Sequence, residues 1–529
     1  MHRISSRRLR PLLLLLVVVR LSDGPAAHAF ILGKNLPGGV DTRWTSTATN
    51  STTGAYGNPI TLTWSLAPDT SPISGSYGTI GTTSNLISTF DATFGGSPSP
   101  AVANDFTQRP WFHLFSDSFN RWNQLGGISF VYEPHDSIMT VGSSSPGLKN
   151  QRGDIRIGGT NFDGVSGTLA ATLFPNIGDI VIDTADMGFF SENNPQNVNG
   201  LAFRNTLMHE TGHAFGLEHV ISTSNEFLMA PVIDLNFDGP QLDEIRAIQY
   251  FYGDPNEKSH NGLGNNTAPN ATALGSIAAG GSIDVGSSAV GKDSGANMVV
   301  GPNESDFVSV FSTTDSDYYS FSVSGPTKLS AVLTPRGGIF NQTSEFDPNP
   351  PTTFNANNRS DLVLTLFGTN GTSQLALVNN TAAGLAEALS GFALPSAGQY
   401  YIRVTGTTAD AVQLYDLNLS VASALVALAG DYNHDGVVNA ADYTIWRDEL
   451  GRTGSGLAAD GNNDNKVDST DFAIWKSNFG HTSPGSGSGS LDPANVPEPS
   501  SASLAVLSLA LCLMGGARRR GAACSSQSR

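Results

Sequence analysis

The 529-residue chain is too long for one hydrophobic core and should form roughly three or four domains. Charged residues make up only 14% of it and there are 58 glycines, which indicates turn-rich β structure rather than long charged helices. The formal net charge of -18 argues against nucleic acid as a partner and suits soluble extracellular modules that bind cations.

The N-terminus has the three parts of a secretory signal peptide. Basic "RRLR" precedes the apolar run "PLLLLLVVV", and Ala27-His28-Ala29 supplies an A-x-A cleavage site. The run is far shorter than the ~20 residues that span a bilayer, so a signal over residues 1–29 is favoured over a membrane anchor. Both cysteines, Cys512 and Cys524, lie near the C-terminus, so we expect no disulfide in the exported body.

Residues 30–255 alternate strand and helix signals in the manner of an α+β domain. Runs rich in β-branched and aromatic residues predict strands at 58–66, 128–133, 154–158 and 178–183. Apolar residues at helical spacing predict helices at 111–125, 203–217 and 242–253.

Residues 256–425 read as an all-β sandwich without a helix signal. Alternating apolar residues predict strands at 317–325, 328–335, 361–368, 399–406 and 415–421. Residues 426–482 contain a repeat of period 29, which predicts a small α-helical pair of calcium loops. A Gly/Ser-rich linker follows at 483–495, and residues 496–529 form a last segment with an apolar helix.

The stretch "HETGHAFGLEH", residues 209–219, has the spacing of a metal site. His209 and His213 lie four apart and share one face of a helix, and Glu210 stands beside the first of them. Gly216 can adopt positive φ and end the helix sharply, which lets His219 return as a third ligand. Three nitrogens and a water make an open tetrahedral zinc site, in which Glu210 is the general base for the activated water.

HExxHxxGxxH is the signature of metzincin metalloendopeptidases, and residues 56–254 resemble their matrixin branch. Met229, in "FLMAP", resembles the Met-turn below the zinc, and Pro231 the wall of the S1' pocket. The resemblance implies a multidomain zinc endopeptidase with one catalytic Zn²⁺ that cleaves proteins or peptides.

The chain departs from matrixins at a second, structural zinc site. Ala171 and Val181 stand where matrixins carry histidines, so that zinc is expected to be missing. The resemblance also implies a neighbouring structural Ca²⁺ site held by Asp163, Asp183 and Asp186. The alternative is that these aspartates only stabilise turns. Glu218, beside the third histidine, is expected to face solvent.

The sandwich resembles the bacterial pre-peptidase C-terminal domain in "DSDYYSFSVSG" (315–325), "AGQYYIRVTG" (397–406) and "YDLNLSV" (415–421). Its aromatic residues are expected to be core rather than a carbohydrate-binding platform. A role in binding or export is implied by the resemblance.

The 29-residue repeat places oxygen-bearing side chains at loop positions 1, 3, 5, 9 and 12 and a backbone carbonyl at position 7. The expected calcium ligands are Asp431, Asn433, Asp435, Val437, Asn439 and Asp442, then Asp460, Asn462, Asp464, Lys466, Asp468 and Asp471. Gly436, and Asn465 in the second copy, allow the sharp turn at position 6. The pair resembles a type I dockerin, which implies a cohesin-type partner; a calcium-folded tail module without a partner is the alternative.

The C-terminal segment resembles a PEP-CTERM sorting signal. Its parts are "VPEP" (496–499), an apolar stretch at 502–517 and three arginines at 518–520. The resemblance implies a sorting enzyme that removes the tail and a protein that is extracellular or attached to the cell envelope; a plain anchor is the alternative.

Two other functions remain open at this point. In the first, the protease fold is catalytically inert, and the sandwich and dockerin-like module serve adhesion or assembly. In the second, the dockerin-like module recruits the chain to a polysaccharide-degrading complex.

Overall fold

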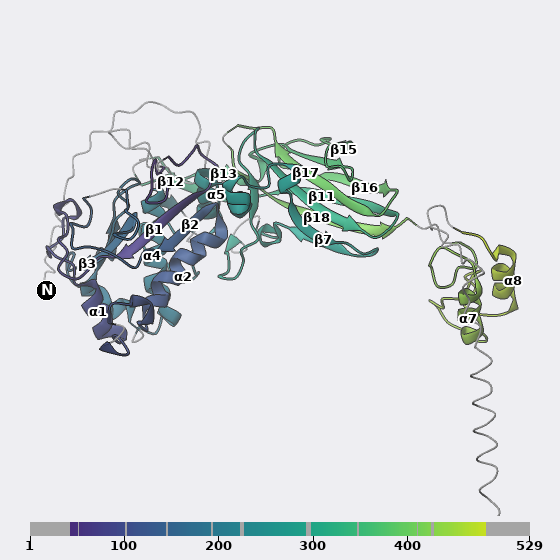
Figure 1. The fold of residues 1–529 in the computed structure, drawn as a ribbon, viewed down its shortest axis with the longest axis horizontal. Coiled ribbons are helices and arrows are strands. Elements are labelled where there is room, and N and C mark those ends of the chain that lie inside the picture. The colour runs from purple at the N-terminus through teal and green to yellow at the C-terminus, as the bar shows by residue number, and fades with distance from the viewer. Residues whose placement is uncertain are drawn as a thin grey trace, which may run out of the picture. The chain divides into compact units, whose positions relative to one another are not determined.

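The computed structural model describes residues 43–482, except for 51, 101–102, 144–145, 192–193, 223–226, 293–297, 346–348, 410 and 425–427. The chain divides into two compact units, one ending at Ala424 and the other beginning at Leu425 (Figure 1). The predicted signal peptide, linker and sorting segment lie outside the described residues. None of the helices described is long and apolar enough to cross a membrane.

The first unit begins with a five-stranded sheet in the order β2-β1-β3-β5-β4. Its strands are β1 (Ile60–Leu66), β2 (Ile128–Tyr132), β3 (Ile155–Thr160), β4 (Ala170–Thr172) and β5 (Ile180–Asp183). The pairs among β2, β1, β3 and β5 are parallel, whereas β4 runs antiparallel to β5 at the edge. β3 and β5 are buried along their whole length, as expected for parallel strands covered on both faces.

Helices pack on this sheet; those of this half are α1 (Leu86–Phe94), α2 (Phe112–Leu125), α3 (Met187–Phe190), α4 (Leu201–Phe215), α5 (Leu242–Tyr252) and α6 (Ser259–Gly262). The apolar stripe of α2 is buried, and its Trp122 meets Phe215 of α4 edge to face at 4.8 Å between ring centroids. The Trp122 indole also donates to the Met208 carbonyl at 3.2 Å. These contacts fix α4 against the core.

The second half of this unit is a β-sandwich. One sheet has the order β15-β14-β17-β10-β7, and the other β16-β11-β18-β8 with β9 beside β18. The strands are β7 (Thr272–Ser276), β8 (Ser282–Val285), β9 (Val308–Val310), β10 (Ser316–Val323), β11 (Thr327–Arg336), β14 (Leu362–Phe367), β15 (Gln374–Val378), β16 (Glu387–Leu394), β17 (Gly398–Gly406) and β18 (Gln413–Ser423). The aromatic rings of Tyr319, Phe321, Tyr400 and Tyr415 are buried between the sheets, in the core role expected of them.

A β-hairpin leaves the sandwich and joins the other half of the unit. Its strands β12 (Ile339–Ser344) and β13 (Thr352–Asn355) pair with each other, and β12 also pairs with β6 (Val220–Ser222), which follows α4. The resulting sheet has the order β13-β12-β6.

One hydrophobic cluster extends from the first half of this unit into the sandwich, which also has a separate core between its own sheets. All eleven residues of α5 are buried, and the core cluster around this helix includes sandwich residues. Tyr250 of α5 meets Phe311 at 5.3 Å between ring centroids, and the Gln249 side chain donates to the Phe307 carbonyl at 3.0 Å. The sandwich therefore covers a helix that the preceding half alone would expose.

The second unit is built from two matching loop–helix segments. Its helices are α7 (Ala440–Glu449) and α8 (Ser469–Asn478). The Trp446 indole of α7 donates to the Asp468 carbonyl, and the Trp475 indole of α8 donates to the Asn439 carbonyl, each at 2.8 Å. Each helix thus holds the start of the other.

Candidate metal centre

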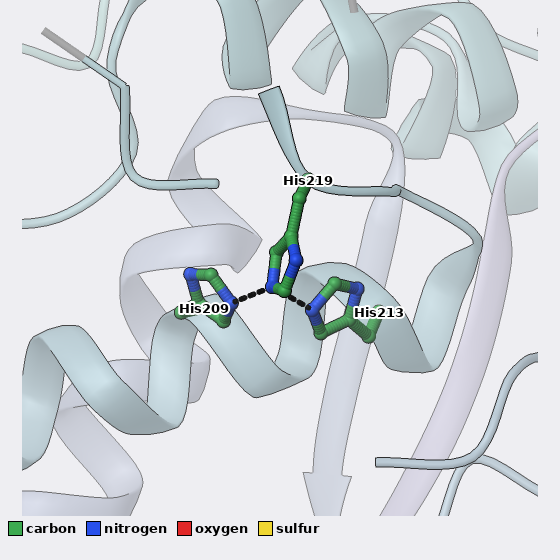
Figure 2. A group of neighbouring side chains, drawn as sticks. All are labelled: His209, His213 and His219. Carbon is green, nitrogen blue, oxygen red and sulfur yellow. Dashed lines mark hydrogen bonds between the residues drawn. The ribbon is translucent and has the colours of Figure 1, made fainter. Parts of the chain in front are cut away.

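Helix α4 and the turn after it bring three histidines together. His209 and His213 lie one turn apart near the end of α4, and Gly216 ends the helix with φ 116°. His219 then points back toward them, as Figure 2 shows. The His219 Nε2 lies 3.2 Å from the Nε2 of His209 and 3.2 Å from that of His213. The three residues predicted from spacing therefore meet at one point.

The opposite nitrogen of each ring faces an oxygen. The Nδ1 atoms of His209 and His213 lie 2.7 Å from the carbonyls of Leu228 and Leu217, and the Nδ1 of His219 lies 2.6 Å from Glu345 Oε2. A neutral imidazole that donates from Nδ1 carries a lone pair on Nε2. The three Nε2 lone pairs therefore point at one another.

This arrangement fits one small cation. Burial lowers the pKa of His209 to about 4 and that of His213 well below its usual value, so both rings are neutral at neutral pH. Neutral lone pairs 3.2 Å apart repel unless a cation lies between them. Tetrahedral zinc with Zn–N bonds of about 2.0–2.1 Å separates its nitrogens by roughly 3.3 Å, close to the distances here.

Glu210 lies beside the histidines and is buried. The Thr172 hydroxyl, from edge strand β4, donates to Glu210 Oε2 at 2.7 Å. Burial raises the pKa of Glu210 to about 7, although the Thr172 hydrogen bond opposes this rise. Thr172 was not foreseen, because nothing in its local sequence shows that β4 ends beside α4.

Met229 packs directly beneath α4. A Cβ added to Gly212 would meet the Met229 Sδ at 2.4 Å, so a larger residue between His209 and His213 would force the Met229 side chain to move. The Met229 amide donates to Glu244 Oε1 at 3.0 Å, and its carbonyl accepts from Val220 at 2.9 Å. Met229 is buried and Pro231, two residues on, is exposed; their roles as Met-turn and S1' wall stay predictions.

Glu218 does not face solvent, and the prediction for it was wrong. Its residue is only 8% exposed, and its pKa is raised to about 7, first by burial and then by the negative charge of Glu345. Glu345 is 127 positions further along the chain, so local sequence patterns could not place it beside this site.

Ala171 and Val181, the two positions at which the resemblance to matrixins would place histidines, face each other in the sheet. Ala171 of β4 and Val181 of β5 are direct partners in the antiparallel register, and neither carries a metal-binding side chain.

The group expected to bind calcium lies nearby on connected loops. Asp186 Oδ1 accepts from the Ser166 amide at 2.6 Å and Asp183 Oδ2 from the Asp163 amide at 3.3 Å. Burial and the two neighbouring aspartates raise the pKa of Asp186.

Within the described ranges, one other trio brings three metal-capable side chains within 4.8 Å. It consists of Asp254, Glu257 and Asp317, all buried where α5 ends and the sandwich begins. The sequence pattern gave no sign of this trio, because its members come from separate elements.

The two repeat loops of the second unit fold alike. Asp431 accepts from the Gly436 amide and Asp460 from the Asn465 amide, each at 2.8 Å. Asn465 adopts φ 67°, which confirms that it replaces the glycine at the sharp turn. The position-9 and position-12 residues also cap the helices: Asn439 with Asp442, and Asp468 with Asp471, form capping boxes. The remaining predicted ligands lie in the same loops; they are Asn433, Asp435, Val437, Asn462, Asp464 and Lys466.

Comparison with known proteins assigns three parts of the chain to families. Residues 101–253 match the Matrixin family model, residues 315–406 the bacterial pre-peptidase C-terminal domain, and residues 429–480 the dockerin type I domain. Metalloendoproteinase 2-MMP of Arabidopsis thaliana is 30% identical over 145 residues, which are 26% of this chain and 36% of that protein. Matrix metalloproteinase-15 of Homo sapiens is 30% identical over 174 residues, 29% of this chain and 24% of that protein.

The chain thus spans about a third of the first of these relatives and about a quarter of the second. Among solved structures, the type II cohesin-dockerin domain from Bacteroides cellolosolvens is 42% identical, covers 11% of this chain and 92% of that chain, and has a TM-score of 0.10. From N- to C-terminus, the chain therefore carries a matrixin domain, a bacterial pre-peptidase C-terminal domain and a type I dockerin domain.

Proposed function

We propose that the protein is a zinc-dependent endopeptidase that is secreted or held at the cell surface and hydrolyses peptide bonds in proteins. The observation that carries this proposal is the meeting of three Nε2 lone pairs beside the buried carboxylate of Glu210. The matrixin match and the two metalloproteinase relatives support the same reaction class.

Each residue of the site has a separate role in peptide hydrolysis. His209, His213 and His219 hold the zinc, which when bound polarises the substrate carbonyl and acidifies a nearby water. Glu210 accepts the proton of the attacking water and later delivers it to the leaving amine. A carboxyl pKa of about 7 suits both transfers near neutral pH. Thr172 holds the carboxylate in place through its hydroxyl.

Edge strand β4 supports the choice of an extended peptide as substrate. It pairs with β5 on one side, and no described strand pairs with its other side. An extended chain can add to such an edge through main-chain hydrogen bonds. Because Thr172 ends β4 and contacts Glu210, a peptide added there would pass the catalytic carboxylate.

The remaining expectations extend this proposal to the rest of the chain. Ca²⁺ would be held structurally by the two dockerin loops and by the Asp163, Asp183 and Asp186 group, with a cohesin-type protein as partner. Export and envelope attachment rest on the sequences of residues 1–29 and 496–529. Fractionation of cells that carry an epitope-tagged chain, with and without residues 496–529, tests the attachment.

The proposed activity is tested on the purified exported chain by casein and gelatin zymography and by elemental analysis. We expect one zinc per chain and cleavage that a chelator abolishes. Glu210→Ala should retain the zinc and lose cleavage by about 100-fold or more, the scale of general base catalysis. Bound zinc without cleavage of any peptide in a diverse library would instead support an inert adhesion or assembly protein.

A further inference from the structure

We propose that hairpin β12–β13 of the pre-peptidase C-terminal domain completes the metal centre, with Glu345 as the residue that positions His219. This inference rests on the proposed zinc site. It makes the second domain part of the catalytic apparatus rather than a detachable module.

Strand register places Glu345 opposite the third histidine. β12 and β6 pair antiparallel with Ser344 opposite Val220 and Thr343 opposite Ile221. Continuing this register by one residue sets Glu345 opposite His219. Facing residues in an antiparallel pair hold their Cβ atoms about 4.5–5.5 Å apart, close enough for side chains to meet. The distance of 2.6 Å between Glu345 Oε2 and His219 Nδ1 agrees with this placement.

Buried contacts hold the hairpin in that register. The Phe340 ring of β12 packs on Phe227 at 5.6 Å between centroids. The Phe354 ring of β13 lies under the guanidinium of Arg246 from α5, at 5.3 Å. Both phenylalanines belong to the core cluster that contains α4 and α5. The hairpin is therefore anchored to the helices that carry and support the site.

His219 differs from the other two ligands in its need for such a partner. His209 and His213 sit on α4 and donate to backbone carbonyls, whereas His219 follows the helix and faces a carboxylate. A carboxylate on Nδ1 fixes the tautomer that directs the Nε2 lone pair to the metal and makes the ligand more basic. Glu345 supplies for His219 the acceptor that the carbonyls of Leu228 and Leu217 supply for the other two.

The test measures zinc affinity of the full exported chain by competition with a chromophoric chelator. Loss of such an outer partner typically weakens metal binding 10–100-fold, so we expect that loss for Glu345→Ala. Glu345→Gln should fall between it and the parent chain, because the amide oxygen still accepts the hydrogen bond. The visible spectrum of the Co²⁺-substituted chain should shift for Glu345→Ala, which reports a changed ligand environment.

Glu304→Gln is the matched control. Its carboxylate is exposed to a similar degree, 39% against 42%, and pairs with Lys292 in the same domain. It should keep the parent affinity and spectrum. Equal zinc affinity for Glu345→Ala, Glu304→Gln and the parent, all shown to be folded by thermal unfolding, would overturn the inference. A parent chain that binds zinc but cleaves nothing would refute the proposed activity while leaving this ranking of affinities valid.

Discussion

At the scale of single residues, the centre depends on groups that set the charge state of Glu210. Burial favours its neutral form, and the hydroxyl of Thr172 favours the carboxylate. The spacing of residues 209–219 was enough to predict the histidines and Glu210, because helix geometry is local. Thr172 and Glu345 were beyond prediction, because strand packing alone brings them to the site.

Thr172→Val should shift the acid limb of the kcat/KM profile to higher pH. The variant removes the hydrogen bond that stabilises the charged form, so the pKa of Glu210 rises further and the active base is lost at a higher pH. A hydrogen bond to a charged group contributes about 1.5–3 kcal/mol, which sets an upper bound of roughly one to two pH units. Thr168→Val, an exposed position near the same sheet, should leave the profile unchanged. If the acid limbs of the two variants coincide, Thr172 does not stabilise the charged form of Glu210.

Gly212→Ala should destabilise the first unit despite the better helix propensity of alanine. The new Cβ meets the Met229 sulfur at 2.4 Å. Such overpacking costs about 1–3 kcal/mol, against about 1 kcal/mol gained from propensity. Gly188→Ala is the control, since a Cβ there meets nothing within 4 Å. Thermal unfolding midpoints compare the two variants. A midpoint for Gly212→Ala at or above that of the control would show that the Met229 side chain moves aside at little cost.

At the scale of elements, α5 is the helix on which the two halves of the first unit meet. Its Arg246 is fully buried, lies 3.7 Å from Asp243 and donates to the Val412 carbonyl at 3.3 Å. The sequence predicted α5 from its apolar spacing. It did not show that the polar face of the helix would also be buried, because that depends on strands more than fifty residues later.

Burial raises the pKa of Asp243 well above its usual value, and the charge of Arg246 opposes that rise. Arg246→Ala should lower the free energy of unfolding of the first unit by about 3–5 kcal/mol, because it leaves this buried carboxyl without its cationic partner. Arg452→Ala breaks the exposed pair with Glu449 and should cost less than about 1 kcal/mol in its own unit. Urea unfolding followed by tryptophan fluorescence measures both. Similar small losses would mean that Asp243 is solvated or protonated in the folded chain.

The carboxylates where α5 meets the sandwich give stability a pH dependence. Burial, together with neighbouring negative charge, raises the pKa of Asp254 to about 7 and that of Glu257 to about 8. Unfolded carboxyls titrate near pH 4, so the folded chain binds more protons between about pH 4 and 8. Stability from these groups is therefore lost as pH rises through that window.

In chelating buffer, the thermal unfolding midpoint should decrease as the pH is raised from 5 to 8. Asp317→Asn should make this decrease with pH smaller. The pKa of Asp317 is also raised well above its usual value by burial and by Asp254. Asn keeps an acceptor for the Tyr415 hydroxyl, which lies 2.7 Å from Asp317 Oδ2. Asp448→Asn, at an exposed site, is the control. If the midpoint changes with pH equally in the two variants, the buried carboxylates around Asp317 are not the source of the pH dependence.

At the scale of the whole molecule, the order of the domains followed from sequence, whereas the core shared by the first two did not. Motif spacing, strand alternation and the 29-residue repeat are local signals, and each identified its region. The hairpin β12–β13 escaped notice, since its polar residues alternate weakly and its partner β6 lies about 120 positions earlier.

Chains truncated after residue 424 or after residue 255 should behave differently. The cut after 424 falls between the two compact units and should leave cleavage rate and zinc content unchanged. The cut after 255 exposes α5 and removes Glu345, so we expect aggregation or a large loss of thermal stability. Solubility, zinc content and casein cleavage of the two fragments decide this. A stable, fully active 30–255 fragment would show that the shared core is dispensable.

The pairing of β12 with β6 also makes the metal centre sensitive to length. Side chains on a strand alternate between faces, so deleting one residue from β12 between its anchored Phe340 and Glu345 would turn the carboxylate to the opposite face. The composition of the hairpin would hardly change, yet His219 would lose its acceptor. Removing two residues would restore the face but set the carboxylate two register positions short, opposite Ile221 instead of His219. Insertions and deletions between Phe340 and Glu345 should therefore harm the metal centre more than most substitutions there.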